Sequence, residues 1–243
     1  MSDPIRESLL AKGGGPSPFE PLFLLADSQL LFRGAHGPSI LDRVRTHLPR
    51  EPRCAYLGAA NGEERAYYDL FRAAVEAAGL GEGRMVHARY QAADREWLER
   101  AHLVVLSGGD VDRGWRIFRQ SGIAEALTAR YAAGAVLLGV SAGAVHLGWG
   151  HLNLVPAVIG AHEEADDWSD LRRRLAASHE RVRGLGIPTG GGFLYHSDGT
   201  VEAVRRPLHE LIWEEDGNTL RDSLLLPPGE EAAGDLAPDE PVN

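Results

Sequence analysis

Short apolar runs alternate with helical patterns along most of the chain. Residues 103–106 (Leu-Val-Val-Leu) form an uninterrupted apolar run, as expected of a parallel strand that is covered on both faces. Residues 63–78 instead carry apolar side chains at helical spacing, namely Ala66, Leu70, Phe71 and Val75. This alternation predicts a parallel sheet with right-handed crossovers. We expect strands at residues 22–25, 30–32, 55–57, 85–87, 103–106 and 136–138.

The helices expected between these strands cover residues 40–48, 63–78, 95–101 and 115–133, the last one broken near Ser121-Gly122. After His162 the pattern changes to a helix at 170–182 and short strands at 193–195, 200–204 and 211–213. Ser197-Asp198-Gly199 is typical of a hairpin turn. The predicted fold class is therefore α/β, a doubly wound, mostly parallel sheet with helices on both faces and a short antiparallel C-terminal part.

The composition divides the chain into three parts. Residues 1–18 are polar and end in a Gly/Pro stretch, and residues 227–243 carry five acidic and no basic side chains. The linker-like Gly/Pro stretch predicts a flexible N-terminus. The last segment has too little apolar surface to offset the entropy of ordering it, which predicts an acidic, disordered tail. The remaining residues, 19–226, are expected to form a single α/β domain.

Charge and cysteine content exclude several classes of protein. The net charge of −10 argues against nucleic acid or an anionic membrane as a partner. Cys54 is the only cysteine, which excludes an internal disulfide and disfavours a cysteine-based zinc site, so we expect no metal or cofactor. Its apolar surroundings predict a buried core residue. No secretory pattern is visible, and a cytoplasmic location is the expectation.

The motif Gly139-Val140-Ser141-Ala142-Gly143 matches G-x-S-x-G after a predicted buried strand and before a helix-compatible stretch. Small neighbours let the chain turn sharply and expose the Ser141 hydroxyl at the carboxyl edge of the sheet. The amide of Ala142 then points to where an oxyanion would develop. The motif favours a nucleophile, and a small-residue turn without chemistry is the alternative.

A second turn, Ser107-Gly108-Gly109-Asp110, follows the strand expected at residues 103–106. Paired glycines can present consecutive amides to an anion, and ligands of open parallel sheets bind at the carboxyl ends of the strands. Most Gly-Gly-Asp sequences are only turns. Beside Ser141, however, this turn could supply a second oxyanion donor.

A nucleophilic serine needs a base, and His162 is the best candidate among ten histidines. It ends the extended apolar run 154–161, which can return it to the carboxyl edge of the sheet. A solvated loop histidine is the alternative. Seven of the other histidines are expected to be structural or unremarkable: His36, His47, His87, His102, His146, His151 and His209.

Taken together, these motifs resemble the peptidase E and cyanophycinase family of serine peptidases, whose fold is related to that of class I glutamine amidotransferases. The similarity extends over residues 22–213 and includes 56–60, 106–110, 139–144, 152–156 and the turn 186–190. The resemblance implies that Ser141 is the nucleophile, that His162 is the general base, and that the amides of Gly109 and Ala142 form the oxyanion hole. It also implies a monomer or homodimer that cleaves a small peptide or amide, often beside an acidic residue, and uses no cofactor. Candidate substrate-binding residues are Gly108, Asp110, Arg113 and Arg116.

Two departures from the family pattern concern the third catalytic group. Members of the family usually carry a carboxylate between the serine and the histidine, yet residues 142–161 contain neither Asp nor Glu. Thr189 also stands where the family commonly has glutamate. The candidates for an orienting acid are Glu163, Glu164 and Asp166. Loss of this acid can lower turnover by about 10⁴-fold.

The sequence leaves two further hypotheses open. The missing carboxylate suggests a catalytically weak or silent relative that binds an acidic peptide or small molecule at the same place. Alternatively, an α/β-hydrolase esterase would take its acid and base from later in the chain, where Asp198 and His209 could serve.

Overall fold

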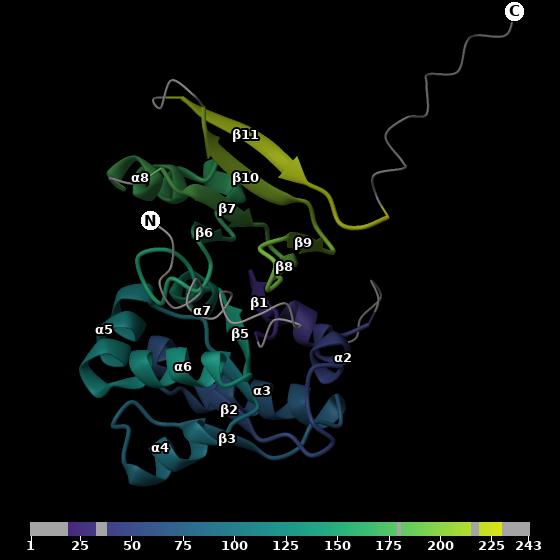
Figure 1. The fold of residues 1–243 in the computed structure, drawn as a ribbon, viewed down its shortest axis with the longest axis vertical. Coiled ribbons are helices and arrows are strands. Elements are labelled where there is room, and N and C mark those ends of the chain that lie inside the picture. The colour runs from purple at the N-terminus through teal and green to yellow at the C-terminus, as the bar shows by residue number, and fades with distance from the viewer. Residues whose placement is uncertain (1–18, 33–37, 179–180, 215–218, 230–243) are drawn as a thin grey trace, which may run out of the picture.

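The structure is a computed structural model in which residues 19–32, 38–178, 181–214 and 219–229 are described. The expectations for residues 1–18 and 230–243, and for His36, lie outside these ranges. The described residues form two sheets, and the chain passes between them after residues 140, 187 and 204 (Figure 1).

The first sheet has seven strands in the order β3-β2-β4-β5-β1-β8-β9. Its first five strands are parallel, whereas β8 runs antiparallel to β1 and β9 antiparallel to β8. This arrangement confirms the predicted mostly parallel sheet. The strands are β1 (Leu22–Leu25), β2 (Cys54–Leu57), β3 (Gly83–Val86), β4 (Leu103–Leu106), β5 (Val136–Val140), β8 (Gly192–Tyr195) and β9 (Val201–Val204).

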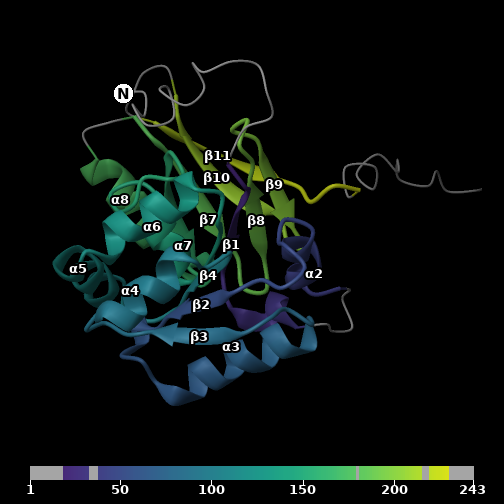
Figure 2. The same cartoon turned by 60° about the horizontal axis from the view of Figure 1, so that its bottom comes forward.

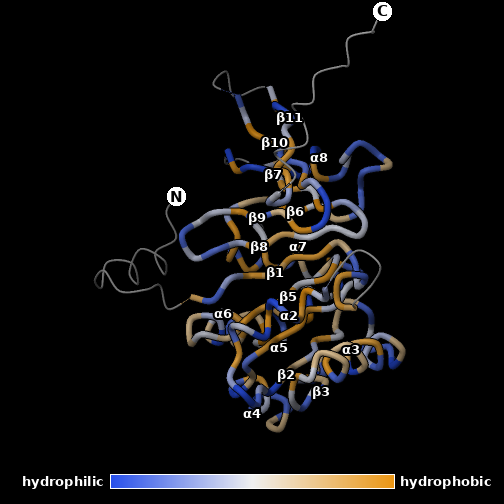
Figure 3. The backbone as a smooth tube through the Cα atoms, turned by 90° about the vertical axis from the view of Figure 1, so that its right-hand side faces the viewer, coloured by the Kyte–Doolittle hydropathy of each residue, from blue (hydrophilic) through white to orange (hydrophobic). Residues whose placement is uncertain are grey.

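Helices cover both faces of this sheet, because alternate side chains of each strand point to opposite sides. Val104 and Leu106 of β4 pack with α4 (Ala92–Glu99), α5 (Val111–Ser121), α6 (Ile123–Ala132) and α7 (Ala142–Leu147). Leu103 and Val105 pack on the other side, with α2 (Ile40–Arg45) and α3 (Arg65–Ala77). Figure 2 shows α3 on the side of the sheet away from α5 and α6. Burial on both faces explains the uninterrupted apolar runs, which are orange in Figure 3.

The second sheet has four strands in the order β11-β10-β7-β6 and carries α8 (Ser169–Ala177) on one face. Leu171 and Leu175 of α8 pack against Val158, Leu211 and Trp168. This sheet is larger than the short antiparallel part that the sequence predicts, and β6 and β7 pair in parallel. Its strands are β6 (Ala157–Ala161), β7 (Arg183–Ile187), β10 (Leu208–Trp213) and β11 (Leu220–Leu225).

Several predicted elements differ from the observed ones. The strand expected at residues 30–32 is wrong, because Ser28–Leu31 form a 3₁₀ helix, η1. The Asp27 side chain caps this helix by accepting from the Gln29 amide at 2.8 Å, and the turn itself buries Leu30 and Leu31. The helix expected at 170–182 ends at Ala177. The break predicted near Ser121-Gly122 is confirmed, since Gly122 has φ +85° between α5 and α6.

Cys54 lies fully buried in β2, as expected. Burial raises the pKa of its thiol to about 12, which keeps the thiol protonated and makes it a core residue rather than a nucleophile.

Candidate active site

Ser141 sits at the junction of β5 and α7 with φ +50° and ψ −112°, a backbone conformation that is strained for a residue with a side chain. Its amide donates to the carbonyl of Leu25 at 2.9 Å, which ties the turn to the neighbouring strand β1. The sequence therefore places this serine correctly at a strand-to-helix turn.

The glycines around Ser141 are required by close backbone packing. A Cβ at Gly143 would lie 2.1 Å from the carbonyl oxygen of Leu106, and a Cβ at Gly139 would lie 2.5 Å from the backbone of Gly143. A Cβ at Gly108 would come within 3.3 Å of the Ser141 Cβ. The start of α7 therefore rests directly on β4, and the loop after β4 borders the serine.

His162 reaches Ser141 from the second sheet. Its Nε2 lies 2.8 Å from the Ser141 Oγ, within hydrogen-bond distance for transfer of the hydroxyl proton. The residue follows β6 with φ +49°, and its own amide donates to the carbonyl of Ile187 at 2.8 Å. The strand before His162 thus returns it to the serine, as the sequence suggested.

The loop after β4 lies beside the serine, since a Cβ built at Gly108 would lie 3.9 Å from the Ser141 Oγ. Gly109 has φ +134°, and the amide of Asp110 donates to the carbonyl of Ala60 at 3.0 Å, which fixes the loop against η2 (Ala59–Asn61). Within the described part of the chain, the amides of Gly109 and Ala142 donate to no acceptor. Neither amide is therefore bound to a backbone carbonyl.

None of the three carboxylates considered for orienting His162 hydrogen-bonds to its ring. Glu163 accepts from the Leu171 amide at 2.9 Å and pairs with Arg174 at 3.2 Å, so it holds α8 instead. Glu164 accepts from the amide of Thr189 at 2.9 Å. Asp166 is exposed in η3 (Glu164–Asp166). Glu163 and Glu164 therefore bind backbone amides of other segments rather than the His162 ring.

The charge of His162 nevertheless helps to lower the pKa of the Glu164 carboxyl. Partial burial by itself would raise the pKa of Glu164, but the side chain and amide of Thr189 and the charge of His162 together lower it. Glu164 is therefore ionised at neutral pH, beside the position where the family commonly has glutamate.

The candidate substrate-binding residues lie at the start of α5. Asp110 caps this helix by accepting from the Arg113 amide at 2.7 Å, so its carboxylate has a structural partner. Arg113 and Arg116 are exposed. A Cβ at Gly62 would lie 3.2 Å from the Arg113 guanidinium, which places that charge over the end of η2.

The other histidines lie in separate environments. His146 is fully buried and its Nε2 hydrogen-bonds to the carbonyl of Val111 at 2.9 Å, which agrees with a packing role. His151 lies beside it, and burial, followed by the charges of His146 and Arg174, lowers the pKa of His151 to about 4. Both imidazoles have lowered pKa values and stay neutral at pH 7.

The α/β-hydrolase hypothesis is wrong. His209 bonds Asp222 at 2.7 Å in the second sheet, and Asp198 accepts from the Thr200 amide at 2.9 Å in the hairpin turn. Neither side chain contacts Ser141 by a hydrogen bond.

Asp27 is not singled out in the sequence analysis, although the structure gives its side chain a long-range contact. Its Oδ2 accepts from the Gly190 amide at 2.7 Å, so it binds the turn that connects the two sheets. A signal was present, because Asp27 follows a predicted strand at the carboxyl edge of the sheet, where functional side chains gather. The strand wrongly predicted at residues 30–32 hid this signal.

The described residues contain no group of three or more His, Cys, Asp or Glu side chains that could hold a metal ion. Within the same part of the chain, no helix is both long and apolar enough to cross a membrane.

A serine at the end of a strand of the doubly wound sheet, within hydrogen-bond distance of a histidine from the second sheet, is the arrangement of an α/β serine hydrolase. The sequence model of Peptidase family S51 matches residues 22–149, more than half of the chain. The chain therefore belongs to this family and is a serine peptidase, which confirms the resemblance to peptidase E and cyanophycinase. The matched residues include Ser141 but end before His162, so the position of the histidine rests on the geometry.

Two solved structures are similar in fold. A peptidase from an acI-B1 Actinobacterium aligns with a TM-score of 0.64 and 16% identity, over 87% of this chain and 96% of that one. A candidate peptidase E protein from Listeria monocytogenes EGD-e aligns with a TM-score of 0.56 and 15% identity, over 77% of this chain and 99% of that one. At this identity the likeness shows the fold alone. No curated protein matches the sequence.

Proposed function

We propose that this serine peptidase hydrolyses a small peptide or amide through an acyl-enzyme on Ser141, with His162 as the general base. The observation that carries the proposal is the 2.8 Å contact between the Ser141 Oγ and the His162 Nε2. The strained backbone of Ser141 supports it, since such strain is typical of a nucleophile held at a strand-to-helix turn.

In the proposed reaction, the Ser141 Oγ attacks the carbonyl carbon of the scissile bond while His162 takes the hydroxyl proton. The amides of Gly109 and Ala142 donate to the oxyanion that forms. When the C–N bond breaks, the imidazolium returns its proton to the departing amine, leaving an ester on Ser141. Water, activated by the same imidazole, then hydrolyses the ester and releases the carboxylic acid.

Glu164 is the best-placed carboxylate to stabilise the imidazolium. It binds the Thr189 amide instead of the ring, so it contributes through its charge and does not fix the ring by a hydrogen bond. Because an orienting hydrogen bond can contribute about 10⁴-fold to turnover, we expect a slower enzyme than one with a complete triad.

An acidic residue on the acyl side of the substrate is the proposed specificity, as in the family, and Arg113 is its proposed partner. Arg113→Ala is expected to lower kcat/KM for an Asp-containing dipeptide by about 10- to 100-fold, because a charge-assisted hydrogen bond contributes about 1.5–3 kcal/mol. The loss should be much smaller for the matching Asn dipeptide. Steady-state kinetics on both substrates measure the difference.

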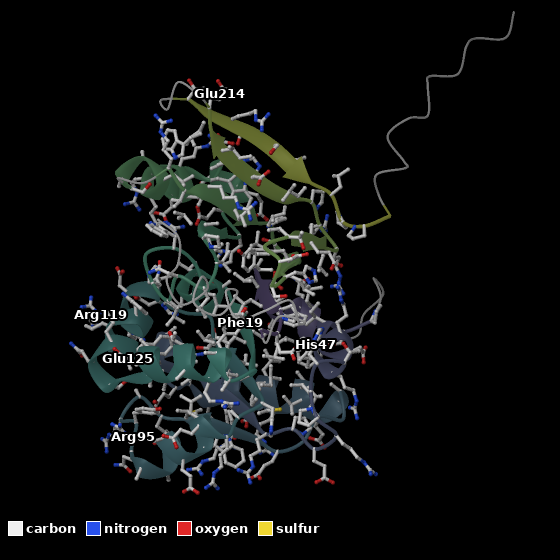
Figure 4. The ribbon with its side chains drawn as sticks, viewed as in Figure 1. Phe19, His47, Arg95, Arg119, Glu125 and Glu214 are labelled. Carbon is white, nitrogen blue, oxygen red and sulfur yellow. The ribbon has the colours of Figure 1, made fainter. Side chains whose placement is uncertain are left out.

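The control is Arg119→Ala, which removes a charge from the last turn of the same helix. Arg119 lies at the outer edge of the molecule (Figure 4) and should leave both substrates unaffected. Equal losses on the Asp and Asn dipeptides would contradict the assignment of Arg113.

A fluorophosphonate probe tests the proposed function itself. We expect the wild-type protein to form one covalent adduct, which peptide mass spectrometry locates on Ser141. A weak or silent relative that only binds an acidic ligand would give no adduct at Ser141 and no turnover of Asp-containing dipeptides, and that result would refute the proposal.

A further inference from the structure

The two reactive side chains come from different sheets. Ser141 follows β5 of the seven-stranded sheet, whereas His162 follows β6 at the edge of the four-stranded sheet. The chain passes from the second sheet to the first through residues 188–191, between β7 and β8, and we name this segment the junction turn. The relative placement of the two sheets sets the distance between nucleophile and base.

The junction turn is bound to the loop that carries His162. The amide of His162 donates to the carbonyl of Ile187, the residue just before the turn, at 2.8 Å. The Glu164 carboxylate accepts from the amide of Thr189 at 2.9 Å. The end of β7 and the turn that follows it are therefore bound to the His162 backbone and to Glu164, two residues further along the chain.

The junction turn is also bound to the residues that follow β1, the strand whose Leu25 carbonyl accepts from the Ser141 amide. Asp27 Oδ2 accepts from the amide of Gly190 at 2.7 Å, and the amide of Ala26 donates to the carbonyl of Gly191 at 3.0 Å. One residue before Ala26, the carbonyl of Leu25 accepts from the amide of Ser141 at 2.9 Å. A continuous series of contacts thus connects the serine to the histidine through Ala26 and Asp27.

Asp27 is itself held in place. Its Oδ1 accepts from the Gln29 amide at 2.8 Å, and its Oδ2 also accepts from the Gln29 side chain at 3.2 Å. An ionised carboxylate that accepts three N–H groups makes stronger bonds than a neutral acceptor can. Asp27 therefore connects the first turn after β1 to the junction turn, 163 residues away in sequence.

We propose that Asp27 is a positioning residue that sets the approach of His162 to Ser141 by clamping the junction turn between the two sheets. This inference rests on the proposed function of the Ser141–His162 pair. The clamp matters here because, among the described residues, no carboxylate binds the His162 ring, so its position depends on its backbone. A misplacement of about 1 Å can lower a rate by about 10²-fold.

The test compares Asp27→Ala and Asp27→Asn with the wild-type protein. We expect Asp27→Ala to lower kcat for an Asp-containing dipeptide and the rate of fluorophosphonate labelling by about 10- to 100-fold, with KM changed by less than about twofold. Asparagine keeps one carbonyl oxygen and can accept from either the Gln29 amide or the Gly190 amide, but not from both. The kcat and the labelling rate of Asp27→Asn should therefore lie between those of Asp27→Ala and the wild type.

A matched control is Asp198→Ala. Asp198 also accepts from a backbone amide in a turn, that of Thr200, but in the β8–β9 hairpin. This variant should lose stability without losing labelling rate. If Asp27→Ala likewise lowers Tm but labels at the wild-type rate, Asp27 is only structural and the inference is overturned.

A spectroscopic measurement separates this inference from the proposed function. The ¹⁵N resonance of His162 Nε2 should move when Ser141→Ala removes its partner, and Asp27→Ala should move it in the same direction. An unchanged resonance in Asp27→Ala would overturn the clamp even if the wild type is active. If the wild type does not react with the probe, the proposed function fails, while the resonance comparison still decides the role of Asp27.

Discussion

Ser141→Ala is expected to lower turnover of an Asp-containing dipeptide by about 10⁴- to 10⁶-fold and to leave the fold intact. The hydroxyl is the only group that can form the proposed ester, and the half-buried side chain leaves no large cavity when it is shortened. His162→Ala should produce a loss of the same order. Because the two side chains act as one unit, the double variant should be little worse than either single variant.

Single-turnover and steady-state kinetics measure these losses, and circular dichroism and Tm check the fold. His209→Ala is the matched histidine control, since His209 pairs with Asp222 in the second sheet and should not affect the rate. Turnover that survives in Ser141→Ala would assign the chemistry to another residue.

Gly143→Ala is expected to be the most disruptive single methyl addition for the fold. The new Cβ would lie 2.1 Å from the carbonyl oxygen of Leu106 in β4, and neither backbone can yield without separating α7 from the sheet. We expect a destabilisation of at least about 3 kcal/mol, beyond the usual cost of overpacking, because the clash is with backbone. Urea unfolding, or failure to obtain folded protein, measures the effect.

The control for this variant is Gly150→Ala. Gly150 has φ +86° but no atom within 4 Å of a new Cβ, so only the backbone strain of about 1 kcal/mol applies. A Gly143→Ala protein as stable as Gly150→Ala would show that α7 does not rest on β4 as closely as described.

Much of the first sheet could be predicted from the sequence, because strands that are buried on both faces consist of uninterrupted apolar residues. The second sheet was harder to predict. In β7, Gly184 and Gly186 leave room for Leu175 and Trp168, so the strand lacks the side chains that would show a pattern. In β11 half of the side chains are exposed and none is buried, and its pairing with β10 defines it.

The Ser141 turn was determined by the sequence alone, because small residues at fixed spacing beside a buried strand allow only a sharp turn at the serine. The candidacy of His162 also came from the sequence, but only the tertiary structure brought its Nε2 to 2.8 Å from the Ser141 Oγ. The role proposed for Asp27 depends wholly on that structure, because its partner Gly190 is 163 residues away. Local sequence patterns indicate which side chains are buried and where the chain turns. Contacts between distant segments, in contrast, form only when the two sheets pack together.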